Sequence, residues 1–145
     1  MLNSFLKPET TGFNVEFYPE DNFLVVAFTG EISLKEIVAS ISDTLRHQEF
    51  TKDMSACYDF SDAVLDIDIN TLDVIFHFMS GLREKRGTHY QLALVYSDEI
   101  TKTLFDFYRL MFARYTVDIE VFTHKNRALE WIKESHKIAT VSYIS

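Results

Sequence analysis

The sequence predicts an α/β fold: a mixed five-stranded sheet with helices on both faces. Five short segments show either alternating apolar and polar residues or a continuous apolar run, as buried strands do. Segments with helical spacing separate the later strands, and such crossover connections join parallel strands. Only the turn 19–22 separates the first two strands. We therefore expect an antiparallel first strand, at or near an edge of an otherwise parallel sheet.

The elements follow in the order β-β-α-β-α-β-α-β-α. Ser33 and Glu36 have the spacing of a capping box and are expected to open the first helix, which should stop near His47. An acidic loop is expected at 61–68, and an edge strand at 137–145 is a further option. The predicted strands are 13–17, 23–29, 56–60, 90–96 and 117–122. The predicted helices are 34–47, 71–86, 97–115 and 126–135.

The helix at 71–86 carries signals at both of its ends. Asn70 is a suitable N-cap, and Ile69 and Val74 have the spacing of a hydrophobic staple. Gly87 is expected to end the helix in a left-handed conformation. Three basic residues in the last turn suit the negative end of the helix dipole: Arg83, Lys85 and Arg86.

Composition narrows the class of protein. The 145 residues suit one domain, 1–145, and 47% hydrophobic with 25% charged residues is typical of a globular chain. A net charge of -8 opposes binding to phosphates, so we predict neither nucleic-acid nor membrane binding. Cys57 is the only cysteine, and no secretion signal is visible, which favours the cytoplasm. Inside a strand, Cys57 is expected to be a small buried hydrophobe.

Two segments support a family resemblance. Asp59-Phe60-Ser61 follows the third strand, and 68–72 reads Asp-Ile-Asn-Thr-Leu at a helix start. Together with the element order, they resemble the STAS domain of sulfate transporters and anti-sigma-factor antagonists over nearly the whole chain. In the antagonists the second segment is Asp-Ser-Ser-Gly-Leu, and its second serine is phosphorylated. The resemblance thus implies a phospho-switch region at Ser61, Asp68, Asn70 and Thr71.

Asn70 occupies the phosphoserine position in this alignment. An amide cannot be phosphorylated, so we expect no regulatory phosphate there and only a weak substitute in Thr71. The aromatic content and the closing segment 128–132 are similar to a divergent bacterial branch, the small stand-alone STAS-like proteins related to lipid-binding CRAL-TRIO domains. This resemblance implies the fold more than the function.

A metal site and a receiver-type phosphoacceptor site are two further possibilities that the sequence does not favour. Ligands of such sheets usually bind beyond the carboxyl ends of the parallel strands, where 30–31, 59–68 and 97–98 should meet. Four carboxylates there suit Mg²⁺ by type, but their spacing fits no ion-binding loop, so we predict turn-formers and no metal. They are Asp59, Asp62, Asp66 and Asp68. Asp59, Ser97 and Lys125 imitate the triad of a phosphoacceptor receiver domain, which would need a helix between the first two strands.

The helix at 97–115 carries two apolar stripes. The first, expected to face the core, is Ile100, Leu104, Phe107 and Met111. The second is Thr101, Phe105, Tyr108, Phe112 and Tyr115. One helix face cannot bury both stripes against one sheet. Either neighbouring helices cover the second stripe, or it is a partly exposed interaction surface; we adopt the second alternative as a hypothesis.

The leading functional prediction is a non-enzymatic STAS-like protein-interaction or regulatory module that binds a protein partner or forms a homodimer. The alternative is a carrier of a small apolar or lipid-like ligand. A receiver-like domain, or an enzyme, ranks third. No catalytic residue and no cofactor are predicted, because the histidines are scattered and neither a phosphate loop nor a nucleophile elbow occurs.

Overall fold

A five-stranded sheet in the order β1-β2-β3-β4-β5 forms the centre of the fold. The computed structural model describes residues 11–144, and the side chains of 11–136. The strands are β1 (Gly12–Tyr18), β2 (Phe23–Ile32), β3 (Ser55–Leu65), β4 (Gln91–Val95) and β5 (Asp118–Phe122). β1 pairs antiparallel with β2, and every later pair is parallel. The predicted mixed sheet with an antiparallel edge strand is confirmed.

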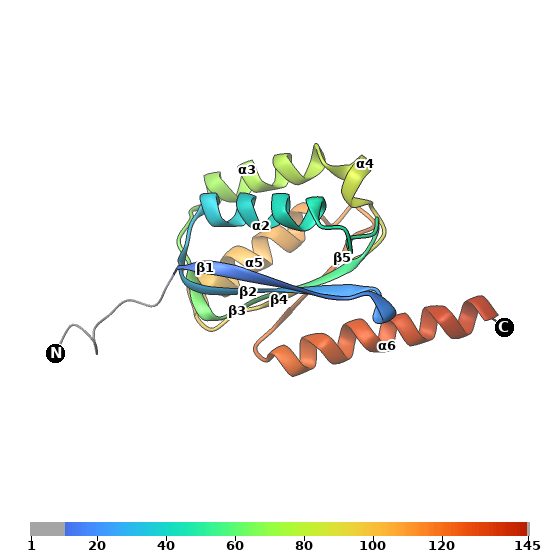
Figure 1. Ribbon diagram of the computed structural model, residues 1–145. Helices are drawn as coiled ribbons and strands as arrows, with labels where there is room; N and C mark the ends of the chain where they lie inside the picture. The colour runs from blue at the N-terminus through green and yellow to red at the C-terminus, as the bar shows by residue number, and fades with distance from the viewer. Residues whose placement is uncertain (1–10, 145) are drawn as a thin grey trace.

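Helices cover both faces of this sheet (Figure 1). One face carries a layer of helices, and the opposite face carries one long helix. The helices of the layer are α2 (Leu34–Arg46), α3 (Ile69–Ser80), the short α4 (Arg83–Arg86) and α5 (Glu99–Met111). The opposite helix is α6 (Lys125–Ile144), and the turn between β1 and β2 is the 3-10 helix η1 (Pro19–Asp21). We call the two sides of the sheet the layered side and the α6 side.

Two hydrophobic clusters lie on the two sides of the sheet. Because side chains alternate along a strand, Leu24 and Val26 of β2 join the cluster of the layered side, while Phe23 and Val25 join that of the α6 side. All four are at most 1% exposed. Coverage on both faces explains why β2 is a continuous apolar run.

β2 and β3 are longer than predicted. β3 continues to Leu65, pairing with β2 up to Ile32 after a register shift between Ala27 and Thr29. The expected acidic loop at 61–68 is therefore mostly strand, and that prediction is wrong. Ala63 and Leu65 are buried and alternate with the exposed Asp62 and Val64, so Asp62 occupies an outward position of the strand, and Asp66 and Asp68 follow its end.

The single helix expected at 71–86 is two helices. Gly81 caps α3, and α4 starts only at Arg83. The N-cap is Asp68 and not Asn70: the Asp68 carboxylate accepts a 2.8 Å hydrogen bond from the Thr71 amide. The staple prediction is wrong as well, because its two apolar side chains are about half exposed, Ile69 at 53% and Val74 at 51%.

Gly87 has a positive φ of 97°, as its predicted left-handed role requires. A Cβ at this position would lie 2.1 Å from Oδ1 of Asp53, so only glycine fits against that carboxylate. At the other end of the chain, α6 continues to Ile144, so the edge strand considered at 137–145 is wrong for 137–144; Ser145 lies outside the described residues. Among residues 11–144, no helix combines the length and the apolar character needed to cross a bilayer.

Candidate functional site

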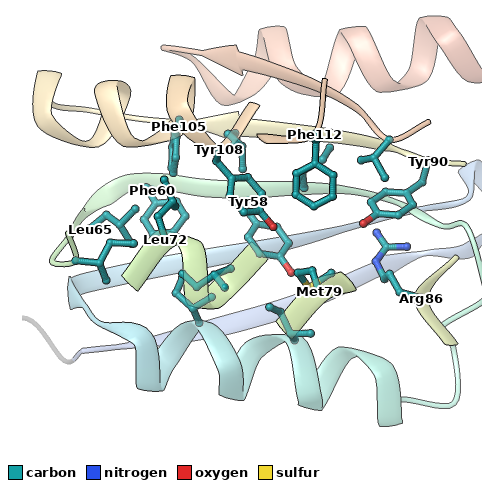
Figure 2. Close-up of a pocket in the computed structure, with 17 residues that line it drawn as sticks. Tyr58, Phe60, Leu65, Leu72, Met79, Arg86, Tyr90, Phe105, Tyr108 and Phe112 are labelled. Atoms are coloured by element: carbon teal, nitrogen blue, oxygen red, sulfur yellow. The ribbon is translucent and has the colours of Figure 1, made fainter. Parts of the chain in front are cut away.

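A cavity of about 60 Å³ lies between the sheet and α2, α3 and α5, on the layered side. Its walls differ from one end to the other (Figure 2). One end is apolar and is formed by Phe60, Leu65, Leu72 and Phe105. Tyr58 and Tyr108 lie in the middle, and Tyr90 and Arg86 lie at the opposite end. The cavity is therefore amphipathic.

Local geometry places these residues. Tyr58 and Phe60 are two apart on β3 and so point to the same face of the sheet. Phe105 and Tyr108 are three apart on α5 and share its inner face. The Phe105 ring packs edge-on against Phe60, with ring centroids 5.3 Å apart. The aromatic wall thus joins one strand to one helix.

Arg86 is the most unusual residue of the cavity wall, because it is only 6% exposed. Its guanidinium lies 3.6 Å from the centroid of the Tyr90 ring and 5.4 Å from that of Phe50. Nη1 is buried and has no hydrogen-bond partner, and no carboxylate of the described residues forms an ion pair with this arginine. A buried charge without a counter-ion costs several kcal/mol.

Asp53 is an acidic neighbour of Arg86, and one oxygen of its carboxylate already has two hydrogen-bond donors. Asp53 Oδ1 accepts hydrogen bonds from the amides of Thr88 at 2.8 Å and His89 at 2.9 Å. Burial lowers the pKa of Arg86, while the neighbouring Tyr90, Tyr58 and Asp53 act in the opposite direction. Asp53 Oδ1 thus binds backbone amides of the loop that follows α4.

The other three polar side chains of the cavity are tyrosines. Burial raises the pKa of Tyr58 to about 12, and it raises the pKa of Tyr108 well above 10. The pKa of Tyr90 is also raised by burial, partly offset by Arg86. At neutral pH these side chains are uncharged hydroxyls that can donate hydrogen bonds, and arginine has only donors. No acidic side chain lines the cavity.

Arg86 also borders a second hollow, which lies outside the cavity and has a volume of about 230 Å³. Arg86, Tyr90 and Phe112 line both spaces. The outer hollow adds Arg83 and Arg114 and is lined by no aspartate or glutamate. On a chain with a net charge of -8, this is a local reversal of charge beside the polar end of the cavity.

The predicted interaction stripe on α5 is mostly buried. Thr101 is 0%, Phe105 4% and Tyr108 9% exposed, so the expected exposure is wrong for these three. Phe112 is half-buried and Tyr115 is 40% exposed. The sheet accounts for part of this burial: the Thr101 hydroxyl accepts a hydrogen bond from the Leu65 amide at 3.4 Å, and Phe105 packs against Phe60. The alternative, cover by a neighbouring helix, holds for Phe112, whose ring centroid lies 4.9 Å from that of Phe76 on α3. The buried residues shape the cavity instead.

The opposite face of α5 is correspondingly open. Ile100, Phe107 and Leu110 are 73%, 43% and 68% exposed, whereas Leu104 is buried. The expectation that Ile100 and Phe107 belong to a core stripe is therefore wrong. α5 lies between the sheet and α3, so its buried arc is centred on the stripe that contains Phe105.

The predicted phospho-switch region lies near the carboxyl ends of the strands. The Thr71 hydroxyl donates to Asp68 Oδ1 at 2.9 Å, and Asn70 is exposed in the first turn of α3. Ser61 lies in β3, where its amide binds Asp59 Oδ1 at 2.9 Å. The geometry joins Asp68 to Thr71 and joins Ser61 to Asp59. The absence of a regulatory phosphate at Asn70 stays a prediction.

The metal, thiol and receiver-domain hypotheses concern residues whose contacts are those of ordinary packing and backbone hydrogen bonding. Among the described residues, no group of three or more histidine, cysteine, aspartate or glutamate side chains could hold a metal. Cys57 is fully buried, and burial raises the pKa of its thiol to about 12. The hairpin β1–β2 stands where a receiver domain would need its first helix. Ser97, the hydroxyl of that imitated triad, donates to the carbonyls of Phe60 and Ala63.

Sequence reasoning missed Arg86, which it placed among surface charges. A signal was present: positions 72, 75, 79, 82 and 86 continue one apolar stripe at steps of three and four residues, and Arg86 is its last member. Arg83 and Lys85 lie off this stripe and are exposed. A charge that falls on an apolar stripe is a candidate for burial.

Sequence comparison finds no relative, because no protein-family model and no curated protein matches the chain. Several solved structures are similar to the chain, including the following two. One is an uncharacterized DUF3478-family protein with a SpoIIAA-like fold from Shewanella loihica PV-4, with a TM-score of 0.54 and 14% identity over 86% of this chain and 96% of that chain. The other is the anti-sigma factor antagonist SpoIIAA in its unphosphorylated form, with a TM-score of 0.50 and 15% identity over 84% and 98%. The chain therefore has a SpoIIAA-like fold, as the STAS resemblance predicted.

Proposed function

We propose that the protein is a cytoplasmic, non-enzymatic STAS-like regulatory module that encloses a small, largely apolar ligand in the cavity of the layered side. The observation that carries this proposal is the cavity itself, whose apolar wall is interrupted by four polar side chains at one end and in the middle. Small-molecule sites typically combine an apolar lining with a few placed polar groups. An apolar ligand in this space would make dispersion contacts with its walls.

The polar groups of the cavity support binding rather than catalysis. Tyr58, Tyr90 and Tyr108 have raised pKa values, so at neutral pH they are neither bases nor nucleophiles. Arg86 has donors only. SpoIIAA, which shares the fold, is an anti-sigma factor antagonist, and this supports a regulatory role in which ligand occupancy changes the surface formed by α3 and α5.

Native mass spectrometry of the purified protein tests the proposal. We expect a non-covalent small molecule that is lost on denaturation. Leu65→Phe, at the apolar end, should fill part of the cavity and reduce the bound fraction while the protein stays folded. Leu129→Phe on α6 is the matched control and should leave occupancy unchanged, because Leu129 packs in the other cluster. A ligand-free wild type whose unfolding temperature no small apolar compound raises would contradict the proposal.

A second candidate function is self-association through the outer face of α5. It is favoured by the exposure of Ile100, Phe107 and Leu110 on one helix face, because large apolar side chains gathered on a surface often mark an interface. Sedimentation velocity should then show a homodimer that Ile100→Ser with Leu110→Ser converts to a folded monomer. Val74→Ser, on an exposed position of α3, is the control. A wild type that stays monomeric at every concentration rules this candidate out.

A further inference from the structure

The polar end of the cavity points to the chemistry of its ligand. We infer that the ligand is an anionic amphiphile whose carboxylate-type oxygens bind the guanidinium of Arg86 while its apolar chain extends toward Phe60 and Phe105. This inference rests on the proposed function, since it assumes that the cavity holds a ligand. It adds the charge of the ligand, its orientation and the residue that recognises it.

The guanidinium of Arg86 lacks both a hydrogen-bond partner at Nη1 and an ion pair with a described residue. Its side chain is 6% exposed, Nη1 has no hydrogen-bond partner, and its contacts are the faces of Tyr90 and Phe50. Aromatic faces attract a cation but accept none of its N–H groups as a carboxylate does. A planar guanidinium offers a fork of donors that matches two anionic oxygens. An incoming carboxylate would supply the missing counter-ion.

No carboxylate of the described residues forms an ion pair with this arginine. Asp53 accepts two backbone hydrogen bonds from the loop that follows α4, at Thr88 and His89. Gly87 lets that loop approach the carboxylate, because any side chain there would collide with Asp53. One oxygen of the acidic neighbour is thus bound to the backbone, and this carboxylate forms no ion pair with Arg86.

The remaining polar groups of the cavity are tyrosine hydroxyls. Tyr58, Tyr90 and Tyr108 come from three different parts of the chain and occupy the middle and the polar end of the cavity with Arg86 (Figure 2). Each is an uncharged hydroxyl at neutral pH and can donate to a ligand oxygen. A set made of an arginine and three hydroxyls favours an acceptor-rich group and disfavours an ammonium group.

An anionic ligand could reach Arg86 from the surface through the outer hollow. The outer hollow, which shares Arg86 with the cavity, adds Arg83 and Arg114 and is lined by no acidic side chain. In a chain with 22 acidic and 14 basic residues, such a hollow attracts anions that most of the surface repels. An amphiphile entering there reaches Arg86 with its head group before its chain passes between α3 and α5.

The size of the two spaces sets the length of the ligand. The cavity of about 60 Å³ holds more than one water, but it is smaller than the cavities of roughly 150 Å³ that accept benzene. The outer hollow of about 230 Å³ leaves room for the head group. The two spaces share Arg86, Tyr90 and Phe112, so a short aliphatic carboxylate would occupy both, with its chain only partly inside the cavity.

The test compares three probes that share an apolar chain and differ in their head group: hexanoate, 1-hexanol and hexylammonium. Calorimetric titration of the full-length protein, stripped of co-purified molecules, should show at least about tenfold tighter binding of hexanoate, because a charged hydrogen bond is worth this much. Arg86→Met keeps the apolar stem and should remove the preference for hexanoate without abolishing hexanol binding. Arg83→Met, in the outer hollow, is the control and should keep most of the preference.

Each other result overturns a defined part of the inference. If 1-hexanol binds as tightly as hexanoate, the anionic character is wrong and the proposed function stands. If no probe binds, the proposed function itself fails. If Arg83→Met removes the preference as fully as Arg86→Met, the anion site is the outer hollow and not the cavity. If the protein instead sediments with phosphatidylglycerol vesicles and ignores free hexanoate, the anion is a membrane head group and an enclosed ligand is excluded. Arg86→Lys, which keeps the charge without the fork, should lose part of the preference and replaces Arg86→Met if that variant does not fold.

Discussion

The two sides of the sheet are packed in different ways. On the α6 side, the cluster consists mainly of small or medium side chains around one phenylalanine: Phe23, Val25, Cys57, Ala93, Val95, Ala128 and Ile132. Each is at most 1% exposed. On the layered side, aromatic rings in edge-on and tilted contacts line a cavity, together with a buried arginine that forms no ion pair with a described residue. One side is built for stability, while the other gives up packing where a ligand could bind.

Adjacent residues of β3 show the same difference. Cys57 points to the α6 side and Tyr58 to the layered side, because neighbouring side chains on a strand face opposite ways. Cys57 fills space among aliphatic neighbours. Tyr58 brings a hydroxyl into an otherwise apolar wall. A single strand thus contributes to both kinds of packing.

The largest effect should come from truncating the same side chain on both sides. Ile132→Ala on the α6 side should lower the free energy of unfolding by about 4–5 kcal/mol, the upper part of the usual range for such truncations. Ile41→Ala, in the cavity wall, should cost nearer 2–3 kcal/mol, because Ile41 already faces empty space and loses fewer contacts. Urea unfolding of both variants measures the difference. Equal costs would show that the layered side is as tightly packed as the α6 side.

The sequence predicted the α6 side better than the layered side. The buried strand 23–29 and the helix at 126–135 follow from apolar periodicity, which reports burial against one neighbour. The layered side depends on how α5 is rotated against the sheet and α3, and periodicity does not show which of its two stripes will face the sheet. For this reason Phe105 was expected outside and Phe107 inside, the reverse of what the structure shows.

The cavity itself could not be predicted from the sequence. The cavity results from side-chain shapes on six elements, and no local pattern encodes it. Arg86 was the accessible clue, since it lies on the apolar stripe of 72–86, but its spacing from Arg83 and Lys85 made it look like part of a basic surface turn. The fold was predictable because its signals are local; the site was not, because it arises from tertiary contact.

The pH dependence of stability at alkaline pH should distinguish the contribution of Cys57 from that of Tyr58. Burial raises the thiol pKa of Cys57 from 9.0 to about 12, so above pH 9 the unfolded chain loses a proton that the folded chain keeps. Stability therefore falls as pH rises from about 9 to 12, by up to about 1.4 kcal/mol per pH unit for this group. For Tyr58 the same loss starts only near pH 10, because its pKa is raised from 10.0 to about 12.

Urea unfolding between pH 8 and pH 11 tests this order. Cys57→Ala should remove most of the slope between pH 9 and pH 10, while Tyr58→Phe should reduce the slope only above pH 10. The comparison uses slopes, so the cost of each substitution at neutral pH does not enter. A Cys57→Ala variant with the wild-type slope below pH 10 would mean that the thiol ionises as easily in the folded protein as in the unfolded chain.

The smallest expected effect is a gain in stability from Arg86→Met. Replacing a buried charge that lacks a counter-ion by an apolar side chain of similar length removes its desolvation penalty; exchange of whole buried ion pairs for apolar side chains is often stabilising by about 1–4 kcal/mol. The variant also loses the contact of the guanidinium with the Tyr90 ring, which is worth about 0.5–2 kcal/mol. The net expectation is a ligand-free protein about 1 kcal/mol more stable, seen as a higher urea midpoint with an unchanged slope. Arg83→Met, at an exposed position over the Tyr115 ring, should change the midpoint little. A clear loss of stability in Arg86→Met would instead make this arginine part of the structural core, and the layered side would then resemble the α6 side after all.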